Sequence, residues 1–263
     1  MSFTEALLLG SLQGMVEWLP ISSEGVVAAV YSLLTGSTLS EAVEFSLWLH
    51  LGTALAALAA LRTEAALVFN ELVRTPRSVG PVSKFFVTAT IVSAPVGLAL
   101  LVGFEDFSER IGGLAMSVVG ALMLVTSAFT YAGRSAVRRN RGNVSWLDAG
   151  LTGVAQGFAA LPGLSRSGLT VAVLLGRGID RGDAIALSFL LSIPVSIGAG
   201  IYAGVRSGAH TSPEAGVALI AASAVGYVSI RALLNVAQRT NFGWFVAFVG
   251  IIIIAGGLWQ AFT

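Results

Sequence analysis

The stretch Leu161-Pro162-Gly163-Leu164-Ser165-Arg166-Ser167-Gly168-Leu169-Thr170 interrupts a long apolar part of the chain and decides the fold. Its proline and glycines break a continuous helix. The apolar segments around the break, Trp146–Leu161 and Gly168–Gly176, are each shorter than the roughly 20 residues needed to cross a bilayer. A charge such as Arg166 costs at least a few kcal/mol within a membrane and by default marks a functional site. The alternative is a surface turn whose arginine points at lipid head groups.

The composition is that of a membrane protein. Of the 263 residues, 55% are hydrophobic and 11% are charged, whereas a soluble domain carries about 25% charged residues. The chain is therefore predicted to be an all-α polytopic membrane protein that forms a single membrane domain over residues 1–263. It contains no cysteine, which excludes disulfides, thiol chemistry and cysteine metal sites.

The break around Arg166 has a counterpart in the first half of the chain. The segments from Gln13 to Gly25 and from Gln156 to Gly168 have the same spacing, at an offset of 143 residues. Each contains Leu-Pro followed by a pair of serines. Matching breakers at one offset predict two repeat halves, approximately 1–132 and 146–263, joined by a basic cytoplasmic loop.

Each half is expected to hold one helical hairpin that enters the membrane and returns on the same side, followed by three crossings. The first hairpin, Thr4–Thr35, is broken at Pro20-Ile21-Ser22-Ser23-Glu24. A mixed segment, Arg62–Gly80, is expected at the membrane interface, and Glu105–Arg110 is expected to form a short acidic loop. The expected crossings are Leu39–Leu61, Val82–Phe104, Ile111–Ala132, Ile185–Gly204, Ala215–Ala232 and Phe242–Thr263. Three crossings invert the second half, so the predicted fold is an inverted-topology repeat of six transmembrane helices plus two re-entrant hairpins, as in secondary transporters.

The distribution of basic residues favours this topology, because Lys and Arg concentrate on the cytoplasmic side of membrane proteins. With two returning hairpins, twelve of the 15 basic residues share one side, Arg110 and Arg206 lie on the other, and Arg166 stays within the membrane. If the second hairpin were a full crossing, the split would shrink to nine against five. Both termini are therefore expected outside. The basic loop Gly133–Asn143 is interpreted as an ordinary cytoplasmic loop, so no nucleic-acid partner is expected.

The two breaks are expected to meet and to form an anion site. The half-helices that begin near Gly25 and Gly168 carry unpaired N–H groups and partial positive charge at their first turns. Arg166 adds a planar fork suited to phosphate. Further donors come from the hydroxyl groups of Ser22, Ser23, Ser165, Ser167 and Thr170. Such a pocket suits a phosphorylated lipid whose tail stays in the bilayer.

Three more side chains have roles that the sequence leaves open. Glu17, beside the first break, is interpreted as a general base or a divalent-metal ligand. The alternative for Glu17 is a salt bridge to Arg166 that ties the hairpins together. Glu24 shares the role of Glu17, or is an acid that caps the helix or faces solvent. His50 is a buried core histidine or a group that handles protons.

Three stretches of the chain resemble the undecaprenyl-diphosphate phosphatase family of the bacitracin-resistance type. Gln13-Gly14-Met15-Val16-Glu17-Trp18-Leu19-Pro20-Ile21-Ser22-Ser23 resembles the first signature of the family. Pro162-Gly163-Leu164-Ser165-Arg166-Ser167-Gly168 resembles the second, and Leu49-His50-Leu51-Gly52-Thr53 resembles a third, shorter one. The resemblance covers essentially the whole chain, and the first two signatures together are specific.

The resemblance implies an integral membrane hydrolase that removes the terminal phosphate from a C55 polyprenyl diphosphate. This reaction regenerates the carrier lipid for cell-wall peptidoglycan and glycan assembly and is linked to antibiotic resistance. The family implies a multi-pass enzyme of the cell membrane, opening to the outer face and helped by a divalent cation, Mg²⁺ or Ca²⁺. By position, Glu17 matches the essential acid, Ser23 the proposed nucleophile and Arg166 the phosphate-binding arginine. Gln13 falls where many members have a second glutamate that contributes to the substrate site.

One position departs from the family pattern. The family usually follows the serine pair with x-Gly-His, but this chain has Glu24-Gly25-Val26. Either Glu17 with a metal or His50 takes over the task of that histidine, or the activity is weaker or altered, as in a divergent archaeal branch with another polyprenyl chain. A polyprenyl-phosphate flippase that uses the same site is the main alternative, and a non-catalytic lipid-binding scaffold is a further one. The sequence also leaves a homodimer open.

Overall fold

The computed structural model describes residues 1–111, 114–132, 139–207, 212–236 and 243–262, apart from some side chains within helices. In these residues the chain forms eleven α-helices. They are α1 (Phe3–Val16), α2 (Ser23–Thr35), α3 (Leu39–Ala60), α4 (Arg62–Arg74), α5 (Pro81–Ile111), α6 (Ala115–Ala132), α7 (Trp146–Phe158), α8 (Arg166–Gly176), α9 (Arg181–Ser207), α10 (Pro213–Val236) and α11 (Gly243–Phe262). The predicted all-α fold is confirmed.

Both predicted breaks are present, between α1 and α2 and between α7 and α8. The helix after each break begins with the same cap. Ser22 caps α2 by accepting a hydrogen bond from the N–H of Gly25, and Ser165 caps α8 by accepting one from Gly168. These residues are 143 positions apart in each case, so the repeat seen in the sequence is also a repeat of local structure.

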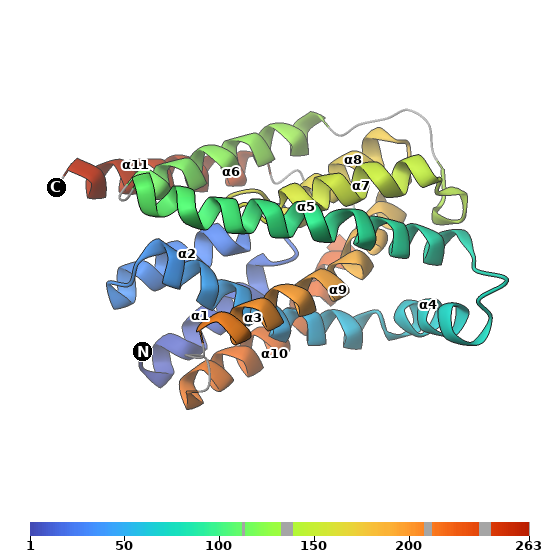
Figure 1. Cartoon of the computed structure of the whole chain (residues 1–263), viewed down its shortest axis with the longest axis horizontal. Helices are drawn as coiled ribbons and strands as arrows, with labels where there is room; N and C mark the ends of the chain where they lie inside the picture. The colour runs from blue at the N-terminus through green and yellow to red at the C-terminus, as the bar shows by residue number, and fades with distance from the viewer. Residues whose placement is uncertain (112–113, 133–138, 208–211, 237–242, 263) are drawn as a thin grey trace.

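The two halves exchange their hairpins when they pack. Helix α1 of the first half packs on α10 of the second half, and α7 of the second half packs on α5 of the first. Glycines allow both contacts. A Cβ atom at Gly10 would collide with the backbone of Ala218, and one at Gly153 would lie 2.7 Å from the carbonyl oxygen of Ala89. Helix α3 likewise packs on its counterpart α9, and α6 on α11 (Figure 1).

Within the described residues, four helices are long and apolar enough to cross a membrane, which makes the chain a multi-pass membrane protein. These four segments are Leu39–Ala60, Pro81–Phe104, Arg181–Arg206 and Pro213–Leu234. They coincide with four of the six expected crossings. The other two expected crossings contain α6 and α11, fall partly outside the described residues, and stay predictions.

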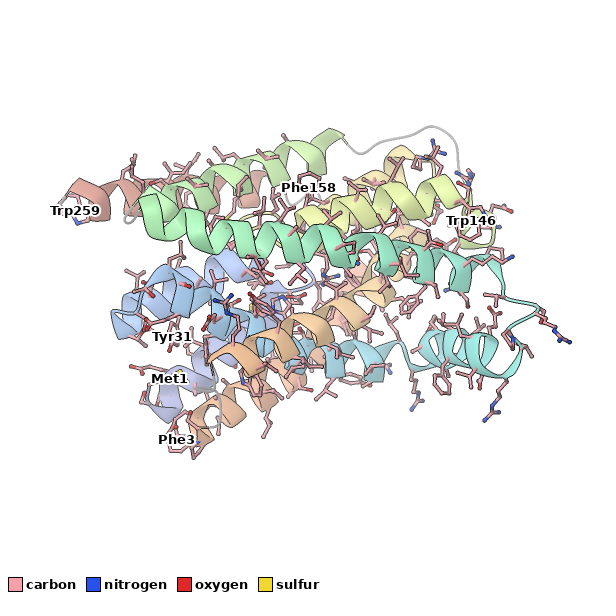
Figure 2. All side chains as sticks on the ribbon, viewed as in Figure 1. Met1, Phe3, Tyr31, Trp146, Phe158 and Trp259 are labelled. Atoms are coloured by element: carbon pink, nitrogen blue, oxygen red, sulfur yellow. The ribbon has the colours of Figure 1, made fainter. Side chains whose placement is uncertain are left out.

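The two ends of the long axis of the molecule carry different elements. Figure 1 shows the N-terminus and the end of α11 at one end of the long axis and α4 at the other. Exposed aromatic side chains lie at both ends, with Phe3 and Trp259 near the termini and Trp146 at the opposite end (Figure 2). Aromatic side chains are enriched at the two membrane–water interfaces, so this placement fits a long axis that runs across the membrane.

Charged side chains tie the segment before α7 to the second hairpin. The carboxylate of Asp148, which is fully buried, accepts hydrogen bonds from Nη2 of Arg139 at 2.9 Å and Nε of Arg177 at 2.7 Å. Arg141 pairs with Asp183 at 3.7 Å. The first six residues of the predicted basic loop, 133–138, lie outside the described residues.

The predicted acidic loop at Glu105–Arg110 is wrong, because α5 continues through it to Ile111. The segment Glu105-Asp106-Phe107-Ser108-Glu109-Arg110 contains neither glycine nor proline. Glutamate and arginine are good helix formers. Charge alone therefore did not end the helix, and a breaker follows only with Gly112-Gly113 in the sequence.

Candidate active site

The centre of the site is an ion pair between the two halves of the chain. Glu17 is the residue that ends α1, and Arg166 is the first residue of α8. Nη2 of Arg166 donates a hydrogen bond to Oε1 of Glu17 at 2.6 Å, and their side chains are only 10% and 2% exposed. The two breaks thus bring together the acid and the arginine that the sequence singled out.

The second oxygen of Glu17 holds the proposed nucleophile. The Ser23 hydroxyl donates a hydrogen bond to Oε2 of Glu17 at 2.7 Å. The side-chain amide of Gln13, one turn earlier on α1, donates to the same oxygen at 2.9 Å. A carboxylate in contact with a hydroxyl group can accept its proton, so Glu17 is placed to act as a general base toward Ser23.

The two breaks also contact each other directly, as predicted. Ser22 accepts a hydrogen bond from the backbone N–H of Gly163 at 2.8 Å, and Ser167 donates one to the carbonyl oxygen of Leu19 at 2.8 Å. Gly163 has a φ of 105°, and a Cβ atom there would collide with the carbonyl oxygen of Val119. Only glycine therefore fits this crossing of the two hairpins.

Several residues expected to bind the anion are instead engaged in holding the breaks together. The N–H groups of Gly25 and Gly168 already donate to Ser22 and Ser165. The hydroxyl of Thr170 donates to the carbonyl oxygen of Arg166 at 2.7 Å. These contacts fix the geometry around Arg166. Direct substrate binding by these residues stays a prediction.

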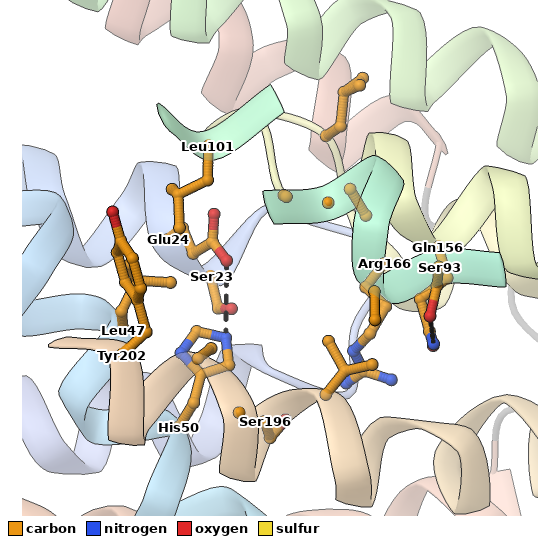
Figure 3. A pocket seen from close by; sticks show the side chains of 18 of the residues that line it. Ser23, Glu24, Leu47, His50, Ser93, Leu101, Gln156, Arg166, Ser196 and Tyr202 are labelled. Carbon is orange, nitrogen blue, oxygen red and sulfur yellow. Dashed lines mark hydrogen bonds and ion pairs between the residues drawn. The ribbon is translucent and has the colours of Figure 1, made fainter. Parts of the chain in front are cut away.

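A cavity of about 310 Å³ opens beside the ion pair, which is within the range of small-molecule sites. Figure 3 shows Arg166 between two groups of polar side chains, with Ser23, Glu24 and His50 on one side and Ser93 and Gln156 on the other. The rest of the lining is largely apolar and includes Leu47, Leu98, Leu101, Leu164, Val195 and Ala199. One polar site with an apolar extension suits a ligand that combines a charged head with a hydrocarbon tail.

Glu24 and His50 both line this cavity. The sequence alone left the positions of these two side chains undecided. Glu24 was expected to cap a helix or to face solvent, but it is 9% exposed and lines the cavity. Nε2 of His50 lies 3.4 Å from Oε2 of Glu17 and 3.7 Å from Oε1 of Glu24. The pattern of α3 could not show this, because its apolar residues run all round the helix and do not mark which side holds His50.

The acids and histidines of the described residues form no group of three or more that could hold a metal ion. Both oxygens of Glu17 are occupied by protein donors: Oε1 by Arg166, and Oε2 by Ser23 and Gln13. The arrangement therefore does not fit a metal ion held by Glu17. His210, the second histidine of the chain, lies outside the described residues.

Comparison with known proteins agrees with this geometry. A relative from Methanococcoides burtonii named undecaprenyl-diphosphatase is 39% identical, over 97% of this chain and 98% of its own length. Relatives of the same name from Haloarcula marismortui and Parabacteroides distasonis are 40% and 31% identical, over at least 96% of both chains. The family described as bacitracin resistance protein BacA matches residues 6–256. This chain therefore belongs to the BacA family.

Proposed function

We propose that this chain is an integral membrane phosphatase that hydrolyses a polyprenyl diphosphate, of the undecaprenyl type, to the monophosphate and inorganic phosphate. The observation that carries the proposal is the contact of Ser23, Glu17 and Arg166 inside one cavity with an apolar extension. The relatives' names support the same reaction and give the flippase alternative no support. The product would return to the cell as carrier lipid for wall and glycan assembly.

The geometry supports a division of work among three side chains. Arg166 would bind the terminal phosphate and stabilise the charge that builds up on it in the transition state. An arginine in this role can increase the rate by roughly 10³- to 10⁵-fold. Ser23, or a water molecule in its place, would attack the phosphorus. Glu17 would take the proton of the attacking group, whose hydrogen bond it already accepts at 2.7 Å.

The chain is further proposed to have six crossings and two re-entrant hairpins, with both termini outside. The basic residues support this orientation, as does the position of α4 at the end opposite the termini (Figure 1). Leu98 and Leu101 of the cavity lie near the end of the Pro81–Phe104 segment, toward the end of the molecule that carries the termini. The site would therefore open to the outer face of the plasma membrane.

A divalent cation, Mg²⁺ or Ca²⁺, is proposed to arrive with the diphosphate rather than to reside in the protein. Mg²⁺ commonly binds through substrate phosphates and keeps several of its waters. This agrees with the lack of a three-residue metal cluster in the described parts of the chain. We expect phosphate release to fall when EDTA is added and to return with excess Mg²⁺, and unchanged release in EDTA would contradict this role.

The test of the function is phosphate release from undecaprenyl diphosphate by the purified full chain in detergent micelles. We expect turnover by the wild type and by Arg74→Ala, which removes an exposed arginine of α4. Arg166→Ala should abolish it, because the phosphate loses its cation. Tight binding of the lipid without release of phosphate by the wild type would overturn the proposal in favour of a carrier.

A further inference from the structure

The orientation of the His50 ring is fixed by its own helix. Nδ1 lies 2.9 Å from the carbonyl oxygen of Ser46, one turn earlier on α3. A carbonyl oxygen only accepts hydrogen bonds, so Nδ1 carries a proton and donates it. The other ring nitrogen, Nε2, is therefore the one that faces the cavity, and its protonation state depends on what surrounds it.

Two carboxyl groups from different helices approach Nε2. Oε2 of Glu17 lies at 3.4 Å and Oε1 of Glu24 at 3.7 Å. An unprotonated nitrogen between two carboxylates would place three acceptors together in a buried site, which is unfavourable. At least one proton must therefore reside in this group, on Nε2 or on Glu24. Oε2 of Glu24 is buried and has no hydrogen-bond partner among the described residues.

Among the described residues that line the cavity, the acids and bases are Glu17, Glu24, His50 and Arg166, and Arg166 contacts Glu17. The cavity residues described on α5 and α9 are uncharged, and the polar ones are Thr90, Ser93, Ser196 and Tyr202. Where α10 packs on α3 near His50, the contacts to Gly52 come from Leu219, Ala222 and Ser223. Glu17 and Glu24 are thus the acids that approach Nε2 of His50 and can exchange a proton with it.

We propose that His50 is a catalytic residue that donates its Nε2 proton to the leaving group, with Glu24 as the positioning residue that stabilises its charged form. His50 would then do from α3 what the family signature implies for a histidine at the position of Val26. Val26 cannot transfer a proton. This inference rests on the proposed phosphatase function and names a second group that touches the substrate.

The proton transfers balance over one turnover. The attacking oxygen forms a bond to the terminal phosphorus and gives its proton to Glu17. The bond from that phosphorus to the bridging oxygen breaks, and its electron pair leaves on the polyprenyl monophosphate, which takes the Nε2 proton of His50. If the attacking group is water, Glu17 then returns its proton to His50 across the 3.4 Å contact, and the starting state is restored. If it is Ser23, a water molecule next attacks the phosphorus of the phosphoserine and gives its proton to Nε2 of His50. The bond from phosphorus to the serine oxygen breaks, this oxygen takes back the proton held by Glu17, and inorganic phosphate is released.

The first test is His50→Gln, which keeps a hydrogen-bonding side chain but cannot exchange a proton in this way. With undecaprenyl diphosphate in detergent micelles, we expect kcat to fall roughly 10²- to 10⁴-fold, the usual size of an acid–base contribution, while KM changes little. The wild type should also lose activity as the pH rises and the acid is deprotonated, and this high-pH limb should disappear in the variant. Arg74→Gln, at an exposed position of α4, serves as the control and should behave as the wild type.

The second test is Glu24→Gln, which removes the carboxylate that stabilises the charged imidazole. The high-pH limb should then move, with little change in kcat at the optimum pH. A merely structural role of Glu24 would lower activity at all pH values alike. This variant decides the matter if His50→Gln does not fold.

The outcomes separate the two proposals. Wild-type kcat and an unchanged high-pH limb in His50→Gln would overturn the role of His50 and leave the phosphatase function standing, as would an unmoved limb in Glu24→Gln. A wild type that binds the lipid without releasing phosphate would instead overturn the function, and the role of His50 would fall with it.

Discussion

Glu17 and Arg166 serve each other as counter-ions before any substrate arrives. Their charges are almost fully withdrawn from water, and a buried charge without a partner is strongly destabilising. The contact between Glu17 and Arg166 therefore has two roles. It holds the two hairpins together, and it keeps a charged arginine and a carboxylate base in place at the site. The structural and the catalytic interpretations of Glu17 are compatible, because a diphosphate would replace the carboxylate as the partner of Arg166.

This double role makes stability and activity separable by mutation. We expect Glu17→Gln to destabilise the protein by roughly 3–5 kcal/mol, because it leaves the buried charge of Arg166 unpaired. Arg166→Met should destabilise it by less, because His50 remains beside Glu17 at 3.4 Å. The double variant removes both charges and should recover most of that loss, yet it should release no phosphate. Thermal unfolding in detergent at one scan rate, together with phosphate release, checks both statements. Single variants as stable as the wild type would contradict the first.

The glycines on α1 and α7 make the exchange of hairpins possible at the level of the helices. At Gly10 a Cβ atom would collide with the backbone of Ala218 on α10, whereas Gly150 on α7 has no neighbouring atom within 4 Å of that position. We expect Gly10→Ala to lower the unfolding temperature by forcing α1 away from α10. Gly150→Ala should be neutral or slightly stabilising, because alanine favours a helix by about 1 kcal/mol over glycine. Equal effects of the two substitutions would show that α1 and α10 do not pack this closely.

Asp148 performs a comparable task at the start of α7. Its two oxygens accept hydrogen bonds from Arg139, before the helix, and Arg177, at the end of α8. Asp148→Asn should destabilise the protein by roughly 1–3 kcal/mol, the range for a buried group that loses charged partners. Asp180→Asn is the matched control, because Asp180 is exposed and asparagine caps a helix as well as aspartate does. The same unfolding midpoint for both variants would argue against a structural role of Asp148.

For the molecule as a whole, the positions of the helix breaks could be predicted from the sequence, but which helices pack against each other could not. A proline followed by a pair of serines favours a break in a helix, so the breaks at Pro20 and Pro162 were predictable from the sequence. The contact of Glu17 with Arg166 was one of the alternatives that the sequence left open. The repeat, too, was visible at one offset. That α1 would pack on α10 rather than within its own half depends on the three-dimensional fit of glycines to a distant backbone, which no local pattern contains.

The same limit explains which roles at the site the sequence left open. His50 and Glu24 belong to different helices, and only the packing of α2 on α3 brings their side chains to one cavity. A useful signal was nevertheless present. The absence of a histidine at Val26 meant that another group had to handle protons, and the chain contains only two histidines. Of the two, His50 lies within a predicted helix, and the sequence therefore named it as one candidate for this task, whereas the role of Glu24 stayed open.

The membrane orientation gives the last prediction, and the lack of native cysteines makes it accessible to labelling. Single cysteines at the exposed positions Thr4, Thr35 and Pro213 should react with a membrane-impermeant maleimide in intact cells. Cysteines at the exposed positions Thr75 and Asn140 should react only after permeabilisation. The outcome at two positions separates the topologies, because a hairpin that crossed the membrane would carry part of the chain to the other side. A protected Thr4 would mean that the first hairpin crosses, and a protected Pro213 would mean that the second one does.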